Sequence, residues 1–244
     1  MSRFIFMLTQ NDVTVPDARA VFEEISDLPI PFVGFKDIGL PVHELKALAD
    51  SIRANGQEVM LEVVSQTKDD ELRSIRAGLE IGVDYILGGT HTEEAVEILA
   101  GSGLKYMPFP GTIVGHPSRL TGAPEEIVAS ARALCTRQGV AGLDLLAYRF
   151  DGNVEALIAN VIASIDLPLI VAGSIASVER IKTVSGLGAW GFTIGGAVFD
   201  RAFLGERTLR GQLQTILDAA GKAVAGESHQ SGSPSRAHGD AGFR

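Results

Sequence analysis

The chain has 244 residues, and its 21 lysines and arginines against 30 aspartates and glutamates give a formal net charge of −9. With 45% hydrophobic and 21% charged residues, the composition is that of a soluble globular protein. The negative charge argues against a nucleic-acid or membrane-surface binder, because both partners are anionic. The single cysteine, Cys135, excludes an internal disulfide and fits a reducing compartment.

No apolar run reaches the roughly 20 residues that span a bilayer. The N-terminal apolar run meets polar residues from Thr9 onward, too soon for a signal peptide, and it lacks a small-residue cleavage site. We therefore expect a cytoplasmic protein without a membrane partner.

Eight short apolar runs recur along the chain, separated by segments with helix signals. The runs are nearly continuous rather than alternating, as expected for parallel strands that are buried on both faces. They cover Phe4–Leu8, Ile30–Phe35, Glu58–Val64, Val83–Leu87, Leu104–Phe109, Leu143–Tyr148, Leu167–Val171 and Ala189–Ile194.

Proline and capping residues mark the expected helix starts between these runs. Pro16, Pro41 and Pro124 stand at expected first-turn positions, where a missing N–H costs little. Thr67 and Ser177 precede acidic residues in the manner of helix N-caps.

Alternating strands and helices indicate parallel βαβ units. Eight units of about 27 residues would fill residues 1–222, which favours a single-domain (β/α)8 TIM barrel. An open, doubly wound sheet is the minor alternative, because such sheets usually have fewer strands.

Two segments fall outside this repeat. Residues 110–122 exceed the usual strand-to-helix connection of about 2–6 residues, so they form a candidate lid, with an ordered structural loop as the alternative. Arg119 in this segment could close over a bound phosphate. Residues 223–244 are rich in glycine and serine and lack apolar periodicity, so we expect a disordered tail.

Glycines follow the last two predicted strands. Gly173 and Ser174 come after the seventh strand, and Gly195 and Gly196 come after the eighth. Glycine lets backbone N–H groups approach a ligand without a Cβ in the way, and this end of a TIM barrel is its recurrent phosphate site. The alternative is that these glycines only form tight turns.

The segments Ala172-Gly173-Ser174-Ile175 and Thr193-Ile194-Gly195-Gly196-Ala197 resemble those of the phosphate-binding TIM barrels. That group includes tryptophan- and histidine-biosynthesis enzymes and sugar-phosphate epimerases. The resemblance implies that Gly173, Ser174, Gly195 and Gly196 bind phosphate through backbone amides. The pattern also looks like that of glycerol-3-phosphate-responsive antiterminators, which are regulatory barrels.

Lys36 and Glu62 are the most informative candidates for chemistry, because each interrupts an apolar strand. A charge in a strand buried on both faces must be paired or must face a solvated site. We expect either an acid/base couple for proton abstraction next to a carbonyl, a Schiff-base lysine, or a structural ion pair.

Three further side chains lie near expected strand ends or helix starts. His91 could polarise a carbonyl from a helix N-terminus, although it could equally be an exposed first-turn residue. Asp12 follows the first strand, and Arg149 could bind an anionic group or pair locally with Asp151. The resulting catalytic candidates are Lys36, Glu62, His91, Asp12 and Arg149.

The resemblance transfers no specific activity. The fifth strand ends in Phe109-Pro110 without an acid, and the seventh strand has none, although acids at such strand ends serve the histidine-biosynthesis barrels and the epimerases respectively. We expect an isomerase, epimerase or aldolase/lyase acting on a small phosphorylated sugar or related metabolite, with a non-catalytic phosphometabolite sensor as the alternative. Charged groups converging at the barrel mouth would favour catalysis, and an apolar mouth would favour sensing.

No cofactor is predicted. Paired-cysteine and His-x-x-x-His spacings are absent from the sequence, so zinc has no support. Asp12, Asp37 and Glu62 leave Mg²⁺ open, and the phosphate site leaves a flavin open. The expected partner is the phosphorylated metabolite, and a homo-oligomer is left open.

Overall fold

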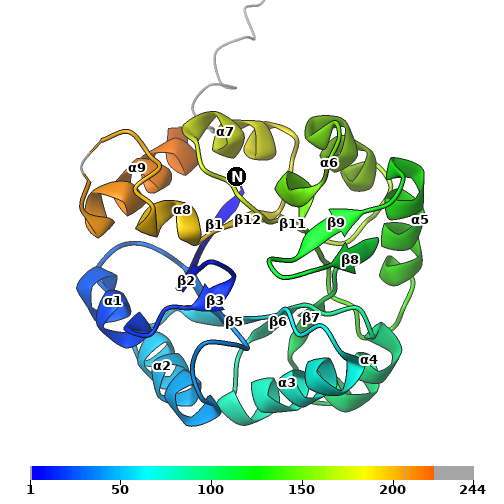
Figure 1. The fold of residues 1–244 in the computed structure, drawn as a ribbon, viewed down its shortest axis with the longest axis horizontal. Coiled ribbons are helices and arrows are strands. Elements are labelled where there is room, and N and C mark those ends of the chain that lie inside the picture. Colours follow the sequence, from blue (N-terminus) through cyan, green and yellow to red (C-terminus); the bar gives the residue numbers. More distant parts are fainter. Residues whose placement is uncertain (1, 206, 223–244) are drawn as a thin grey trace, which may run out of the picture.

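The computed structural model describes residues 2–205 and 207–222, so the tail expected over residues 223–244 lies outside the described residues. A parallel sheet lies at the centre of the molecule and is ringed by helices (Figure 1). The eight strands of this sheet are, in spatial order, β10 (Leu143–Leu145), β11 (Leu169–Val171), β12 (Gly191–Ile194), β1 (Arg3–Met7), β4 (Phe32–Lys36), β5 (Glu58–Val63), β6 (Tyr85–Gly88) and β7 (Lys105–Met107).

Backbone hydrogen bonds join the two ends of this sheet. The N–H of Ala141 donates to the carbonyl of Tyr106 at 2.8 Å, and the N–H of Asp144 donates to the carbonyl of Pro108 at 3.1 Å. The sheet therefore curls into a nearly closed barrel, and the expected single-domain (β/α)8 fold is confirmed.

Helices connect the strands on the outside of the barrel. They are α1 (Ala18–Ile25), α2 (Val42–Ala54), α3 (Lys68–Ile81), α4 (Thr92–Leu99), α5 (Pro124–Cys135), α6 (Val154–Ile162), α7 (Val178–Gly186), the short α8 (Gly196–Phe199) and α9 (Leu209–Lys222). In the described part of the chain, no helix is both long enough and apolar enough to cross a membrane.

The expected helix starts are partly correct. The side chains of Thr67 and Ser177 accept N-cap hydrogen bonds at α3 and α7, and Pro124 is the first residue of α5. Pro41 instead lies just before α2, and Pro16 lies two residues before α1, because both helices begin later than the sequence suggested.

The sixth apolar run was expected to be one strand over Leu143–Tyr148, which is wrong in its second half. Strand β10 ends at Leu145, and a 3-10 turn, η1 (Ala147–Arg149), follows. Leu146 and Ala147 are buried in this turn. A continuous apolar run thus marks burial rather than extended backbone.

Side chains alternate between the two surfaces of the barrel. Outward-facing residues pack under the helices, whereas a separate inner cluster includes Ile5, Met60 and Leu87. At the amino-terminal end of the strands, the rings of Phe32, Tyr85 and Trp190 pack with centroids 5.5 to 6.2 Å apart. These aromatic rings form the floor of the barrel.

Two antiparallel hairpins stand at the opposite, carboxyl-terminal end. One pairs β2 (Thr9–Gln10) with β3 (Val13–Thr14), and the other pairs β8 (Thr112–Val114) with β9 (Arg119–Thr121). Both project toward the middle of the ring of helices (Figure 1). The second hairpin is formed by the long connection that was expected over residues 110–122.

Candidate active site

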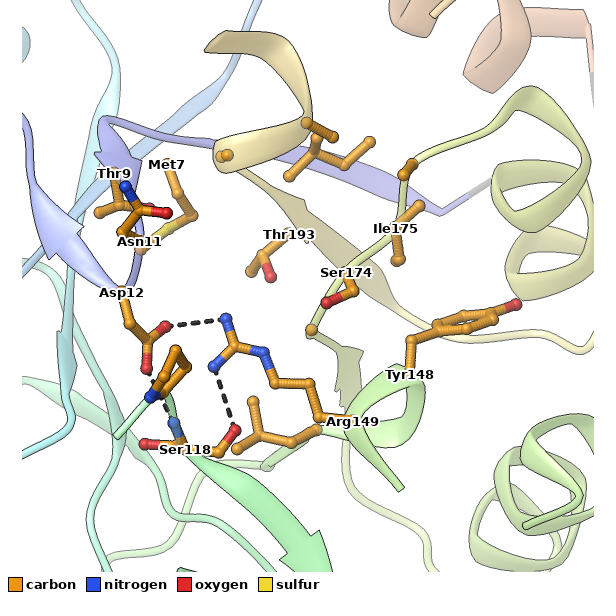
Figure 2. A pocket seen from close by; sticks show the side chains of 18 of the residues that line it. Met7, Thr9, Asn11, Asp12, Ser118, Tyr148, Arg149, Ser174, Ile175 and Thr193 are labelled. Atoms are coloured by element: carbon orange, nitrogen blue, oxygen red, sulfur yellow. Dashed lines mark hydrogen bonds and ion pairs between the residues drawn. The ribbon is translucent and has the colours of Figure 1, made fainter. Parts of the chain in front are cut away.

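A cavity of about 710 Å³ opens at the carboxyl-terminal end of the barrel. Both glycine turns and four of the five catalytic candidates line it; Figure 2 shows Asp12, Arg149 and Ser174 among its lining side chains. Its polar and glycine lining includes Asp12, Lys36, Glu62, Ser118, Arg119, Tyr148, Arg149, Asp151, Gly173, Ser174, Gly195, Gly196 and Asp200. The phosphate-type turns and the charged side chains therefore share one cavity.

A tight turn of the first hairpin places Asp12 in the cavity. Asn11 and Asp12 connect β2 to β3, and both have left-handed backbones, with φ of 51° and 66°. Asparagine and aspartate tolerate this region better than other residues with a Cβ, and two successive left-handed residues form the hairpin turn that matches strand twist. Asp12 thus lies beyond the end of β1, turned back over the barrel.

The carboxylate of Asp12 collects three donors. Its Oδ1 lies 2.6 Å from Nζ of Lys36 and 2.8 Å from Nη2 of Arg149, and its Oδ2 accepts from the backbone N–H of Ser118 at 3.0 Å. Burial would raise the pKa of Asp12, but the hydrogen bond from Arg149 and the charge of Lys36 lower it well below its usual range. Asp12 is therefore an ionised anchor rather than a proton carrier.

Lys36 and Glu62 are neighbours because strand register pairs them. They occupy matching positions on β4 and β5, and Nζ of Lys36 lies 3.1 Å from Oε2 of Glu62. Burial would lower the pKa of Lys36, but the negative charges of Glu62 and Asp12 raise it above its usual value. Lys36 is therefore an ammonium ion, which argues against a Schiff-base nucleophile.

Arg149 bridges the two sides of the cavity mouth. Its Nη2 binds Asp12, while its Nη1 donates to the carbonyl of Ser118 at 3.1 Å (Figure 2). Ser118 belongs to the connection between β8 and β9 and is 3% exposed. The second hairpin is thus tied to the charged cluster at the backbone of Ser118.

Asp144 is a further ionisable residue of this region that sequence reasoning missed. It lies in β10 between Leu143 and Leu145, both of which face the helices, so its own side chain faces the barrel interior. It is fully buried, and burial together with the negative charge of Glu62 raises its pKa well above the usual range. The signal that identified Lys36 and Glu62, a charge inside an apolar strand, is present here too.

His91 does not join this cluster. It is the residue before α4, where its Nδ1 lies 2.7 Å from Oε2 of Glu71 and its backbone N–H donates to Oε1 of the same carboxylate. Glu71 also accepts from the backbone N–H of Thr90. His91 does not line the cavity, and its contacts order the start of a helix.

The first glycine turn has backbone geometry that exposes N–H groups. Gly173 and Ser174 have φ of 84° and 37°, and a Cβ on Gly173 would lie 2.8 Å from Cγ of Arg149. Neither N–H donates to another backbone group in the described part of the chain. Arg180 holds the turn by donating to the carbonyl of Ser174 at 2.5 Å, and it stacks on Tyr148.

The second glycine turn approaches the first hairpin closely. A Cβ on Gly195 would lie 2.5 Å from Oγ1 of Thr9 and 2.8 Å from its carbonyl oxygen, so only glycine fits. Gly196 begins α8, whose first N–H groups lack helical acceptors. Asp200 lies at the other end of α8, where Oδ1 accepts from Nε2 of Gln10 at 2.7 Å.

The carboxylates offered to Mg²⁺ by the sequence are engaged elsewhere. Asp12 and Glu62 both contact Lys36, and Asp37 accepts from the backbone N–H of Val64 and from the hydroxyl of Ser65. Across residues 2–205 and 207–222, no three histidine, cysteine, aspartate or glutamate side chains are grouped as metal ligands would be.

No protein family profile and no curated protein sequence matches the chain. Many solved structures share its fold. A native KDPGal aldolase structure is 15% identical, with 91% of this chain and 96% of that chain covered and a TM-score of 0.64. Tryptophan synthase from M. tuberculosis is 15% identical, with 91% of each chain covered and a TM-score of 0.61.

A regulatory protein is also similar in structure. The glycerol uptake operon antiterminator regulatory protein from Listeria monocytogenes is 20% identical, with 80% of this chain and 91% of that chain covered and a TM-score of 0.55. The expected resemblance to phosphate-binding TIM barrels is therefore confirmed at the level of the fold. Both enzymes and a regulator have this fold, so the activity must be argued from the site.

Proposed function

We propose that the protein is an enzyme that binds a small phosphorylated carbonyl metabolite and moves a proton on the carbon next to the carbonyl. The observation that carries this proposal is that two glycine turns and a lysine–glutamate pair line the same cavity. Isomerisation and epimerisation of sugar phosphates both need such a proton transfer.

The phosphate would bind at the two glycine turns. Gly173 and Ser174 offer N–H groups without a backbone acceptor in the described residues, and Gly195 and Gly196 stand at the start of α8. Backbone N–H groups in such turns favour anions. This local site explains how a chain with a net charge of −9 would still bind a phosphate ester.

Glu62 and Lys36 would perform the proton transfer. Glu62 takes the proton from carbon, and the electron pair of that C–H bond moves toward the carbonyl oxygen. The ammonium group of Lys36 stabilises the negative charge that develops on that oxygen. For isomerisation, the proton returns from Glu62 to the former carbonyl carbon, and the hydroxyl proton of the neighbouring carbon passes to the former carbonyl oxygen, so the reaction balances without a cofactor. For epimerisation, the enediolate would turn over in the cavity before Glu62 returns the proton to its other face.

Asp12 and Arg149 would hold this machinery in place. Asp12 fixes Lys36 at 2.6 Å, which keeps the ammonium group charged and directed. The side chain of Arg149 passes close to the first glycine turn, because a Cβ on Gly173 would lie 2.8 Å from its Cγ. It would contact the substrate's anionic or hydroxyl groups between the turn and the charged cluster.

The first test is a thermal-shift screen of sugar phosphates against inorganic phosphate. A ligand at 100 times its Kd stabilises the folded state by about 2.7 kcal/mol. Compounds that bind are then incubated in D2O, and NMR follows deuterium entering the position next to the carbonyl. Glu62→Gln should abolish deuterium entry, whereas Glu97→Gln, at an exposed site on α4, should not change it.

A non-catalytic sensor is the second candidate. It is favoured by the tie between Arg149 and the hairpin at Ser118, since a ligand that displaces Arg149 would alter the hairpin. A ligand that shifts the melting temperature without any deuterium entry would support the sensor over the enzyme. The absence of any shift with every compound would count against both.

A further inference from the structure

The charges around the inner end of the cavity do not balance if every group is ionised. Asp12, Glu62 and Asp144 would carry three negative charges, and Lys36 and Arg149 would carry two positive charges. The imidazole of His116 lies 3.9 Å from Oδ2 of Asp12 and is not among the charged groups that act on Asp144. Asp12 is bound to both cations, and Glu62 lies 3.1 Å from Lys36. The two positive charges of the cluster are therefore paired with these two carboxylates, and neither cation is left to pair with Asp144.

The surroundings of Asp144 do not suit a carboxylate. Its side chain is completely buried, and neither carboxyl oxygen has a hydrogen-bond partner among the described residues. Its backbone N–H is held by the carbonyl of Pro108, which fixes the strand and so limits reorientation. A buried charge without donors is far more costly than the neutral acid.

Among the described residues, the other elements packed near Asp144 bring no further cation to it. The charged groups that act on it are Glu62 from β5, Lys36 from β4 and Arg149 from η1. On neighbouring β7, Lys105 donates to the hydroxyl of Tyr85 at the floor of the barrel, and Tyr106 faces outward toward Glu71. Neighbouring β11 consists of leucine, isoleucine and valine.

We propose that Asp144 is a positioning residue of this site, a carboxylic acid that keeps its proton in the resting protein. A neutral Asp144 adds no second negative charge inside the barrel beside Glu62, so Lys36 stays directed at Glu62 and Asp12. Its part in catalysis rests on the proposed function, whereas its protonation does not.

Unfolding at a series of pH values tests the protonation directly. In the unfolded chain an aspartate has a pKa of about 4, so a proton retained in the folded state means that wild type loses stability as pH rises above 4. Relative to Asp144→Asn, the unfolding constant of wild type should increase up to tenfold per pH unit until Asp144 ionises in the folded protein. Asp17→Asn, at an exposed residue without a cap hydrogen bond, should leave the wild-type profile unchanged.

A constant ratio of unfolding constants between pH 4 and 8, or one that falls, would overturn the proposal. If Asp144→Asn does not fold, Asp144→Leu removes the carboxyl without adding an unpaired amide and gives the same ratio. Infrared spectroscopy of wild type at pH 7 supplies an independent check, because a protonated carboxylic acid absorbs apart from carboxylates. If wild type lacks the absorption band of a protonated carboxylic acid, the proposal is also contradicted.

The role in catalysis has a separate readout. Asp144→Asn should shift the pH profile of deuterium entry, because an amide cannot ionise and so never adds a negative charge beside the Glu62–Lys36 pair, while Asp17→Asn should not. An unshifted profile would overturn the positioning role. A rising stability ratio with no deuterium entry in any protein would support the retained proton and count against the proposed function alone.

Discussion

Asp12 and Arg149 are 137 residues apart in the chain, yet Oδ1 of Asp12 lies 2.8 Å from Nη2 of Arg149. Each also binds the backbone of Ser118. Through this triangle, the first hairpin, the turn after β10 and the second hairpin hold one another over the barrel mouth. The charged cluster is therefore both part of the proposed site and a long-range contact of the fold.

Replacing Asp12 by asparagine should destabilise the protein substantially. Asparagine has nearly the same shape as aspartate and also tolerates the left-handed backbone. The substitution nevertheless leaves Lys36 and Arg149 without their shared counter-ion. Removing one partner of a buried ion pair costs about 3 kcal/mol or more. Urea unfolding of Asp12→Asn measures this, with Glu23→Gln as control. Glu23 pairs with Arg19 at the surface, so its loss should cost no more than about 1 kcal/mol.

The contribution of Asp12 should disappear in acid. Its pKa is lowered in the folded state, so the stabilisation is fully present above the unfolded pKa of about 4 and is lost as pH falls toward the folded pKa. The difference in unfolding free energy between wild type and Asp12→Asn should therefore narrow steadily below pH 4. A difference that is independent of pH down to 2 would contradict this account.

Lys36 should not form an imine with carbonyl ligands near neutral pH. Glu62 and Asp12 keep its pKa above the usual value of a lysine, and only the neutral amine attacks a carbonyl. Borohydride added with a bound sugar phosphate at pH 7.5 should leave no adduct on Lys36 above the level found on exposed Lys46. Peptide mass mapping that locates the reduced adduct at Lys36 would instead favour aldolase-type chemistry.

Gly195→Ala should weaken binding of phosphorylated ligands more than it weakens the fold. The added Cβ would meet Thr9 Oγ1 at 2.5 Å and would push the turn away from the first hairpin. The thermal shift with a ligand should decrease or vanish, measured against each variant's own unliganded melting temperature. Gly186→Ala is the matched control, because a Cβ there has open space within 4 Å; it should leave the ligand shift intact.

Asp200→Asn should strengthen the binding of a phosphate dianion. Asp200 lines the cavity, and a Cβ on Gly196 would lie 3.9 Å from its Oδ2. Removing a unit charge about 4 Å from a like charge is worth about 1 kcal/mol even at the dielectric constant of water, so Kd should fall at least roughly fivefold. Isothermal titration with a bound sugar phosphate measures the change. Unchanged affinity would place the phosphate away from Gly196.

The repeat of strands and helices was predictable because eight buried strands leave eight apolar runs. Lys36 and Glu62 stood out as charges within such runs, and their contact follows from strand register. The position of Asp12 could not be derived, because it depends on a turn that folds back onto the barrel. Asp144 carries the same signal as Lys36, but it lies near the start of the expected strand rather than at its carboxyl end, which the structure places three residues earlier.

His91 shows a different limit of sequence reasoning. Its place at the start of a helix was correct, but a residue at a strand-to-helix junction can face either the barrel axis or the neighbouring helix. In the structure, Glu71 fixes the direction of His91. It lies 20 residues earlier in the chain and binds both the ring and the backbone of His91. Such a pairing between successive helices leaves no local pattern in the sequence.

The aromatic floor has a practical consequence for measuring the protein. Trp190 is the one tryptophan of the chain, and it lies against Phe32 and Tyr85 with the guanidinium of Arg3 4.6 Å from its ring centroid. That end of the barrel is opposite the cavity. Intrinsic tryptophan fluorescence will therefore report whether the barrel is intact and will change little when a ligand occupies the mouth. Unfolding can thus be followed by this fluorescence in the same sample in which binding is followed by another signal.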